Sequence, residues 1–325
     1  MGGDFAPANV IMGAVEALKE TQNRFEIIFV GPEAVIHDQL RRVQANGAAF
    51  RIVDAPDVID MHDGATAVLK QKKNSSIAVG MNLHRDGKAD AFVSAGHSGA
   101  VMSASTLILG RIEGIGRPTI GAFFPSERGV TLLVDAGANV DCKPQHLFEF
   151  GVMGSIYTRQ MFGIPSPTVG LLSIGEESSK GNDVVKEAHK LLEGSGLNFV
   201  GNVEGRDILK GAVNVVVCDG FVGNILLKFA ESVPGFLKFK VKQAAATSAL
   251  MSVMGLMMKN MMRGVLRSMD YEEYGGVPIL GVNGISIIGH GKSTPKAIKN
   301  MIFKAEEMVL KNINGKIQEA LVLAK

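Results

Sequence analysis

The stretch VVVCDGFVGNILLK, residues 215–228, contains the change of pattern that decides the fold. Its first three residues, 215–217, are valines without polar alternation, which is typical of a strand covered on both faces. The apolar run stops at Asp219, and Gly223 marks the expected start of a helix. A buried strand that leads through a polar turn into a helix predicts an α/β protein with polar groups at the edge of its sheet.

The same pattern recurs along the chain. Apolar runs that end in turn residues lie at 25–31, 91–96, 119–124, 131–137, 168–175, 213–220 and 284–291. Helical patterns fill several of the intervals, at 33–46, 98–109, 144–161 and 181–193. Alternating strands and helices predict parallel βαβ units in a layered αβα fold with a mostly parallel sheet. Because there is no repeat or low-complexity linker, we expect one α/β catalytic body over residues 1–325.

Residues 230–275 differ, because they show helical spacing and no strand pattern, and we expect a helical insertion there. An apolar stripe recurs at helical spacing through Met251, Met254, Met258, Met261 and Val265. Basic residues lie roughly opposite this stripe, at Lys259, Arg263 and Arg267. The stripe either packs in the core or on a second subunit, or it contacts a membrane surface or an acyl chain.

Composition excludes several classes of protein. A formal net charge of +2 over 325 residues argues against bulk nucleic-acid binding. The two cysteines, Cys142 and Cys218, lie far apart without metal-ligand spacing, so we expect a reducing cytoplasm and inert thiols. No apolar run reaches the ~18 residues that a transmembrane helix needs, and the first residues do not predict a signal peptide.

Polar residues at the predicted strand ends are the candidates for binding an anion. Lys180, Gly181 and Asn182 lie where a helix begins after a strand, and free N–H groups at a helix start attract anions. Ser98 is placed similarly and is expected to cap its helix. Asn202 and Glu204 end another strand, and His290 ends the last one.

Each of these residues also has a purely structural interpretation. Ser98 and Asn182 can be simple caps, Asp219 can hold a turn, and His290 can be a hydrogen-bonded structural histidine. Lys228 can be a solvated helix lysine. Taken together, however, these strand ends predict one phosphate-lined cleft. The common dinucleotide, ATP-binding, zinc-protease and esterase motifs are missing from the sequence, so we expect neither a cofactor nor a metal.

Eight motifs give a more specific indication, because together and in order they resemble the bacterial phosphate acyltransferases of phospholipid synthesis (the PlsX type). They are MGGDFAP (1–7), NSSI (74–77), KADAFVSAGHSGA (88–100), DAGANVDCKP (135–144), GEESSKGN (175–182), NFVGNVEGRDI (198–208), VVVCDGFVGNILLK (215–228) and ILGVNGISIIGHGKS (279–293). The resemblance implies a fold similar to phosphotransacetylases and isocitrate/isopropylmalate dehydrogenases. It also implies a homodimer that contacts the inner surface of the cell membrane from the cytoplasm.

The activity implied by the resemblance is transfer of a long-chain acyl group from acyl–acyl carrier protein to inorganic phosphate, which gives acyl phosphate. Three alternatives stay open. One is acyl transfer between phosphate and coenzyme A, another is a non-catalytic scaffold for lipid-synthesis partners, and a less favoured one is a metal-dependent dehydrogenase.

The chain departs from the family pattern in two places. The family usually has a short apolar strand before Asp-Ala-Met-Gly-Gly-Asp, whereas Met1 falls on the Met inside that motif. We therefore expect a gap in the sheet and a cost in stability. The family also commonly has Asn-Thr where this chain has His97 and Ser98, so a titratable side chain stands beside the hydroxyl.

For the implied reaction, the residues are assigned roles as hypotheses. Lys180 and the N–H groups near Gly181 and Asn182 neutralise phosphate, and Asn224 and Lys228 donate hydrogen bonds to phosphate or the oxyanion. Neutral hydrogen bonds to phosphate come from Ser75, Ser76 and Ser98. Asp219 or Glu204 orients a lysine, and His290 protonates the departing sulfur.

The remaining assignments concern the acyl chain and the acidic carrier protein. Asn202, Glu204, Met254 and Met258 are expected to contact the acyl substrate. A basic docking face for the carrier protein is expected at Lys238, Lys240, Lys242, Arg263 and Arg267.

Overall fold

A computed structural model of the protein describes residues 1–45, 47–246, 264 and 275–323. Within these residues, the strands are β1 Ile27–Gly31, β2 Phe50–Asp54, β3 Ala91–Ser94, β4 Thr119–Ser126, β5 Gly129–Val134, β6 Thr168–Leu172, β7 Asn198–Val203, β8 Val215–Val217, β9 Val277–Leu280 and β10 Ile285–Ile288. Eight of them form one sheet in the order β3-β10-β9-β4-β5-β8-β6-β7, and β1 pairs with β2 in a separate sheet.

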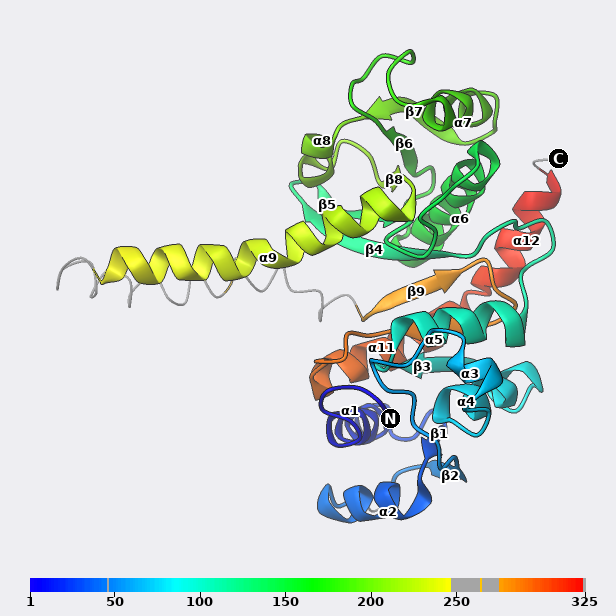
Figure 1. Cartoon of the computed structure of the whole chain (residues 1–325), viewed down its shortest axis with the longest axis vertical. Helices are drawn as coiled ribbons and strands as arrows, with labels where there is room; N and C mark the ends of the chain where they lie inside the picture. The colour runs from blue at the N-terminus through cyan, green and yellow to red at the C-terminus, as the bar shows by residue number, and fades with distance from the viewer. Residues whose placement is uncertain (46, 247–263, 265–274, 324–325) are drawn as a thin grey trace.

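Helices cover both faces of the large sheet (Figure 1). They are α1 Ala8–Glu20, α2 Glu33–Arg42, α3 Ala67–Lys70, α4 Ser76–Arg85, α5 Ser98–Ala104, α6 Pro144–Phe162, α7 Asp183–Glu193, α8 Gly205–Lys210, α9 Gly220–Ala245, α11 Pro295–Leu310 and α12 Ile313–Leu323, with a π-helical turn η1 at Ser105–Leu109. One face packs against α6, α7, α11 and α12. The other packs against α3, α4 and α5 in one half and α8 and α9 in the other. The predicted layered αβα fold is confirmed.

The central strands are mostly apolar because both of their faces are covered. Leu132 and Val134 of β5 contribute to the core with α6, whereas Leu133 between them contributes to the core with α8 and α9. Val216 in β8 faces the same side as Leu133. All of these side chains are fully buried. The alternation of cores along a strand therefore explains the unbroken valine and leucine runs of the sequence.

Strand direction divides the sheet into two parts. β3 and β10 are parallel, and β9 is antiparallel to both of its neighbours, β10 and β4. β4 is antiparallel to β5, and β5, β8, β6 and β7 are all parallel. The carboxyl ends of β3 and β10 therefore lie at one edge of the sheet, and those of β5, β8, β6 and β7 lie at the opposite edge. The single cleft predicted from all strand ends is replaced by two groups of loops.

The long helix α9 begins earlier than the sequence suggested. Asp219 is its N-cap, accepting a hydrogen bond from the N–H of Val222 at 2.8 Å, so the helix starts at Gly220 rather than Gly223. Its first turns pack through Leu226, Leu227 and Ala230, and it then runs outward from the body (Figure 1). Residues 230–245 of the expected insertion thus continue α9, and the insertion as a separate unit stays a prediction.

β1 and β3 belong to different sheets and form no ladder with each other. Met1 lies near the ends of both strands, since it faces Gly31, the last residue of β1, and Gly96, which follows β3. Between them is a cavity of about 640 Å³, lined by β1, β3, α1, α4 and α11. The small sheet is instead attached through apolar side chains of α1 and α2, such as Ile11 and Ile36, which pack against Phe29.

Candidate functional site

Four loops that follow parallel neighbouring strands form the first candidate site, which we call the β5–β7 edge. They comprise residues 135–139 after β5 and 173–182 after β6, together with residues 218–219 before α9 and residue 204 before α8. Because these strands are adjacent and run in the same direction, their loops emerge side by side. Six of the ten predicted phosphate-contacting or catalytic residues lie in these loops or in the first turns of α9: Lys180, Gly181, Asn182, Asp219, Asn224 and Lys228.

Asp135 organises the first of these loops. Its carboxylate is fully buried and accepts hydrogen bonds from the backbone N–H groups of Ile120, Gly137, Ala138 and Asn139, and from the Asn139 side chain. The Asn139 carbonyl then accepts from the N–H of Gly220 at 2.7 Å. The sequence assigned no role to Asp135, although an acid at the end of an apolar run, followed by Gly and Asn, is typical of such a turn.

The start of α9 is held against this loop. A side chain at Gly220 would meet the backbone of Asn139, and one at Gly223 would overlap the backbone of Asp135. Asn224 is exposed and lies against Gly137. Asp219 is engaged as the N-cap, as its structural interpretation predicted. Lys228 is exposed and forms an ion pair with Glu231 at 2.8 Å, which is a weak interaction at a surface.

The loop after β6 presents an exposed lysine beside a helix start. Asn182 caps α7 by accepting from the N–H of Val185 at 2.9 Å. Lys180 is exposed, and Gly181 has a φ of +101°, which favours glycine. A turn places the N–H of Lys180 2.9 Å from the Glu177 carbonyl. Asp183 lies in the first turn of α7 and reduces the positive potential there.

Asn202 and Glu204 have structural partners at this edge. Asn202 is buried, and its side-chain amide donates to the Glu177 carbonyl at 2.8 Å. Glu204 caps α8 and pairs with Arg206 at 2.9 Å. Arg206 also lies 3.3 Å from Glu176, so it links the loops after β6 and β7. Direct contact of Asn202 or Glu204 with an acyl substrate stays a prediction.

Two helix N-termini therefore meet the same edge of the sheet. α7 follows β6 and α9 follows β8, and β6 and β8 are directly paired. Each helix start carries a partial positive charge, and the caps Asn182 and Asp219 already engage the N–H groups of Val185 and Val222 there. Lys180, Asn224 and Lys228 add exposed donors around these starts. This arrangement suits a multiply charged tetrahedral anion.

The opposite edge contains the other predicted polar residues. His97, rather than Ser98, is the N-cap of α5, because its Nδ1 accepts from the N–H of Ala100 at 3.1 Å. The prediction of Ser98 as the cap was wrong, since Ser98 is already the first residue of the helix, where its side chain is exposed. His290 is exposed, and its Nδ1 accepts from the N–H of Lys292.

Ser75 and Ser76 also lie on this side of the molecule, at the start of α4. Both are buried, and Ser75 caps the helix by accepting from the N–H of Ala78 at 3.3 Å. The cap explains Ser75 without a ligand. Phosphate binding by these two serines stays a prediction that the burial of both side chains does not favour.

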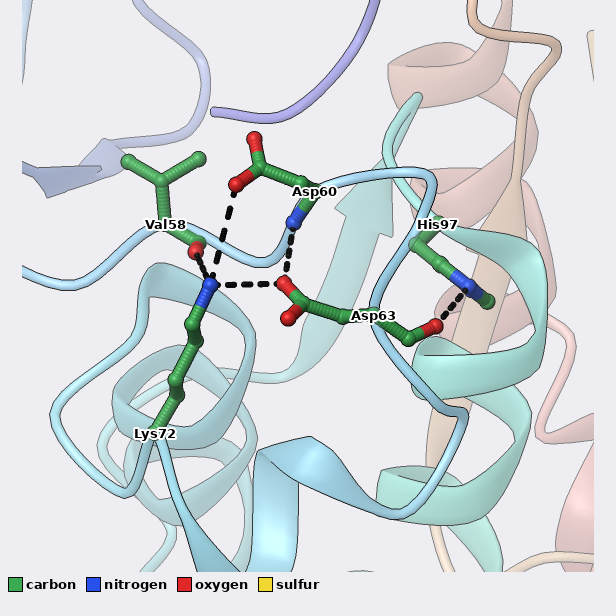
Figure 2. Close-up of polar contacts among 5 residues, drawn as sticks. All are labelled: Val58, Asp60, Asp63, Lys72 and His97. Atoms are coloured by element: carbon green, nitrogen blue, oxygen red, sulfur yellow. Dashed lines mark hydrogen bonds and ion pairs between the residues drawn. The ribbon is translucent and has the colours of Figure 1, made fainter.

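The loop that contains Asp60 and Asp63 lies over this edge and is held in place by contacts with Lys72. Lys72 Nζ lies 2.6 Å from the Asp63 carboxylate, 3.7 Å from Asp60 and 2.7 Å from the Val58 carbonyl. The Asp63 carbonyl lies 3.0 Å from Nε2 of His97 (Figure 2). Because Nδ1 of His97 accepts a hydrogen bond, the proton belongs on Nε2, which donates to Asp63. The neutral imidazole thus joins the loop to α5.

The two thiols are unsuited to catalysis. Burial, reinforced by the charges of Asp135 and Asp219, raises the pKa of Cys142 to about 12. The same effects raise the pKa of Cys218 well above its usual value. Neither thiol supplies a thiolate at neutral pH. In the described part of the chain, no group of three His, Cys, Asp or Glu side chains is placed to hold a metal ion.

The outer part of α9 carries the described members of the predicted docking face. Lys238, Lys240 and Lys242 are all exposed, and Lys240 lies over the ring of Phe236 at 5.8 Å. The other predicted residues of the docking face, Arg263 and Arg267, lie outside the described residues. So does the whole apolar stripe: Met251, Met254, Met258, Met261 and Val265. Among the described helices, none is long and apolar enough to cross a membrane.

Comparison with solved structures defines the class of fold. A phosphotransacetylase from Streptococcus pyogenes matches with a TM-score of 0.63 at 17% identity, covering 92% of this chain and 91% of that one. A phosphotransacetylase from Staphylococcus aureus matches with a TM-score of 0.57 at 16% identity, covering 92% and 99%. The chain therefore has the phosphotransacetylase fold.

Sequence comparison identifies the family. Residues 1–316 match the family described as fatty acid synthesis protein. The phosphate acyltransferase of Pelotomaculum thermopropionicum is 51% identical over 309 residues, covering 95% of this chain and 90% of the relative. That of Chlorobaculum tepidum is 47% identical over 330 residues, covering 99% and 100%. The chain belongs to this family, and it is an acyltransferase.

Proposed function

We propose that this enzyme transfers a long-chain acyl group from acyl–acyl carrier protein to inorganic phosphate, giving acyl phosphate for membrane phospholipid synthesis. The observation that carries the proposal is the pair of helix N-termini at the β5–β7 edge, beside Lys180 and Asn224. A site that holds a multiply charged anion next to amide donors has the features that attack by phosphate on a thioester requires.

The reaction needs no nucleophile from the protein. A phosphate oxygen attacks the thioester carbonyl carbon, and the carbonyl oxygen becomes negatively charged in the tetrahedral intermediate. The carbon–sulfur bond then breaks, the carbonyl re-forms as acyl phosphate, and the thiolate leaves with the carrier. Lys180 and the N–H groups at the start of α7 hold phosphate, while Asn224 and Lys228 stabilise the oxyanion.

We assign the proton for the departing sulfur to His290. His290 follows β10, and Lys180 follows β6, and these two strands end at opposite edges of the sheet. Neighbouring strands of a single chain therefore do not place the two residues side by side. Retention of activity in His290→Ala would remove this assignment without affecting the phosphate site.

We also propose that the acidic carrier protein docks on the basic surface of α9. Lys238, Lys240 and Lys242 are exposed on the part of the helix that leaves the body (Figure 1). Long-range attraction between this surface and an acidic partner accelerates association and is screened by salt.

The apolar side of α9 supports a proposed homodimer. Phe221, Ile225, Phe229, Phe236 and Phe239 are each more than half exposed. At about 100° per residue, these five side chains fall on one side of the helix. Exposed apolar side chains gathered on one side of a helix are typically covered by a partner. A second copy of the chain accounts for it without a further protein.

Peripheral contact with the inner face of the cell membrane is proposed for residues 251–265. Replacing Met254 and Met258 with Asp is expected to release the protein from anionic vesicles in a sedimentation assay, with the melting temperature unchanged. Unchanged binding to the vesicles would reject this part of the proposal.

A second candidate is acyl transfer between phosphate and coenzyme A, which the phosphotransacetylase fold favours. The deciding experiment measures phosphate-dependent release of free thiol from long-chain acyl–acyl carrier protein, with acyl–coenzyme A in parallel. Release confined to the carrier protein supports the proposed reaction. Release from acyl–coenzyme A alone supports the second candidate. If a folded protein releases thiol from neither substrate, the non-catalytic scaffold is the remaining alternative.

The phosphate site itself is tested with Lys180→Ala. Loss of this charge is expected to raise the KM for phosphate by about 10-fold or more, as for the loss of a charged hydrogen bond. Lys190→Ala is a matched control, because Lys190 is also exposed but lies in the last turn of α7. An unchanged KM and turnover in Lys180→Ala would contradict the assignment.

A further inference from the structure

A buried polar pair lies directly beneath the loop that carries Lys180. His189, on α7, is 7% exposed, and Asn202, at the end of β7, is 6% exposed. Nδ1 of His189 and Oδ1 of Asn202 are 2.9 Å apart. The imidazole also packs edge-on against Phe199, with ring centroids 5.0 Å apart. Both side chains are therefore held by several contacts.

The hydrogen bonds fix the orientation of both groups. The Asn202 amide N–H₂ donates to the Glu177 carbonyl at 2.8 Å, so its oxygen faces the imidazole. That oxygen can only accept, and therefore Nδ1 of His189 carries the proton that it donates. The chain of donors runs in one direction, from His189 through Asn202 to Glu177.

The Glu177 carbonyl is the point where this chain meets the loop. It accepts both from Asn202 and from the backbone N–H of Lys180, at 2.8 and 2.9 Å. These two donors hold the turn 177–180 in place, and Gly181 and the N-cap Asn182 follow directly. α7 also carries His189, so the helix is tied at its start and near its middle to the loop that precedes it.

We propose that His189 is a positioning residue for the anion-binding turn, and that it sets the place of Lys180 through Asn202 and the Glu177 carbonyl. This inference rests on the proposed role of Lys180 in binding phosphate. His189 is buried on α7 and is hydrogen-bonded to Asn202, so its proposed effect on phosphate is transmitted through the turn.

A buried amide that loses one partner must reorient or remain unsatisfied. Without the donor at His189, the Asn202 oxygen has no buried partner among these contacts. Rotation of the amide then removes the donor from the Glu177 carbonyl, and the turn loses one of its two fixed points. The ammonium group of Lys180 then occupies a wider range of positions, and this disorder weakens ground-state binding of phosphate.

The test compares His189→Leu with His189→Asn. Leucine has no donor, whereas the amide N–H₂ of asparagine lies close to where Nδ1 lies in histidine. His189→Leu is expected to raise the KM for inorganic phosphate about 10-fold with kcat within about twofold, and His189→Asn to restore it to within about threefold of the wild type. Amide hydrogen exchange in residues 176–182 is expected to accelerate in the leucine variant and not in the asparagine variant.

Two further variants separate positioning from stability. Ala188→Gly destabilises the same helix at a fully buried position, and it is expected to lower the melting temperature without raising the KM for phosphate. Asn202→Asp removes the donor to Glu177 while keeping an acceptor for His189, and it is expected to behave like His189→Leu.

The outcomes distinguish the inference from the proposed function. If Lys180→Ala raises the KM for phosphate and His189→Leu leaves both the KM and the exchange unchanged, the positioning role is wrong and the phosphate site stands. An equal loss of activity in His189→Leu and His189→Asn would also contradict the role. If Lys180→Ala itself has no effect, the proposed phosphate site is wrong, whatever the His189 variants show.

Discussion

Lys72 Nζ lies 2.6 Å from the carboxylate of Asp63, and this ion pair ties the loop before α3 to the segment that follows it. The hydrogen bond from Lys72 lowers the pKa of Asp63, and the N–H of Asp60 lowers it further. The same contact with Asp63 raises the pKa of Lys72. The Asp63 carbonyl also accepts a hydrogen bond from the His97 imidazole. The Asp63–Lys72 pair therefore anchors the loop that covers the start of α5.

The Asp63–Lys72 pair predicts a defined dependence of stability on pH. The pKa of Asp63 is depressed in the folded state, so its contribution is present above the unfolded pKa of about 4 and is lost as the pH falls through the lower folded value. The pKa of Lys72 is raised, so its contribution is present below about pH 10 and is lost as the pH rises through the folded value. The difference in melting temperature between the wild type and Asp63→Asn is expected to be constant from about pH 5 to about pH 9, and to shrink in acid.

Asp141→Asn is the control for this series, because Asp141 is exposed in the loop after β5. It is expected to leave the melting temperature unchanged over the same range. A melting temperature of Asp63→Asn that equals that of the wild type at pH 7 would show that the pair adds nothing to the folded state.

The buried carboxylate of Asp135 predicts a large effect of a small substitution. All five groups that face it are N–H donors. Asp135→Asn replaces one acceptor oxygen with a donor, and at least one N–H then lacks a partner. The expected loss in the free energy of unfolding is about 2–4 kcal/mol, measured by urea denaturation. A loss below about 0.5 kcal/mol, the range of an ordinary surface change, would contradict this account.

The basic surface of α9 predicts a salt-dependent interaction with the acyl carrier protein. Replacing Lys238, Lys240 and Lys242 with Ala is expected to raise the KM for acyl–acyl carrier protein about 10-fold at low salt and to flatten its dependence on salt. The matched control replaces three exposed lysines elsewhere, Lys19, Lys70 and Lys73. Equal effects of the two triple variants would mean that net charge, rather than this surface, governs the interaction.

The apolar side of α9 predicts a dimer that a charge can disrupt. Phe229 and Phe236 are 69% and 58% exposed in the single chain. Replacing both with Asp is expected to convert the dimer to a monomer in light scattering, because two buried carboxylates would have to be desolvated. Phe5→Asp is the control, since Phe5 is 53% exposed away from α9. A wild-type protein that is monomeric at micromolar concentration would refute the proposed dimer.

Much of the fold was predictable because its strands are buried on both faces. All seven apolar runs contain a strand, including β5 and β8, since fully covered strands leave no polar alternation. The short strand β9 was missed because Pro278 and the glycines on either side of the strand interrupt the apolar run that would predict it. The antiparallel direction of β4 and β5 departs from the predicted parallel units, because only two residues, Glu127 and Arg128, join these strands, whereas a parallel connection needs a much longer crossover.

The candidate site was predictable only in part, for a physical reason. Asn, Asp and Ser suit both ligands and helix caps, and the sequence does not distinguish the two uses. Asn182 and Asp219 are caps that lie at the anion-attracting helix starts, whereas Ser75 is a buried cap. His189 contacts Asn202 on another element, so local spacing gave no sign of this pair, whereas the turn around Asp135 has the local acid, Gly and Asn pattern described above.

The cavity between β1 and β3 has a consequence for how the protein opens. In the described residues, β1 forms a ladder only with β2, and β3 forms one only with β10. The small sheet can therefore separate from the large one by losing side-chain packing, without breaking a shared ladder. Amides of Ile27–Gly31 should exchange through a subglobal opening, at a lower free energy than the amides of β5, which open only when the whole molecule unfolds.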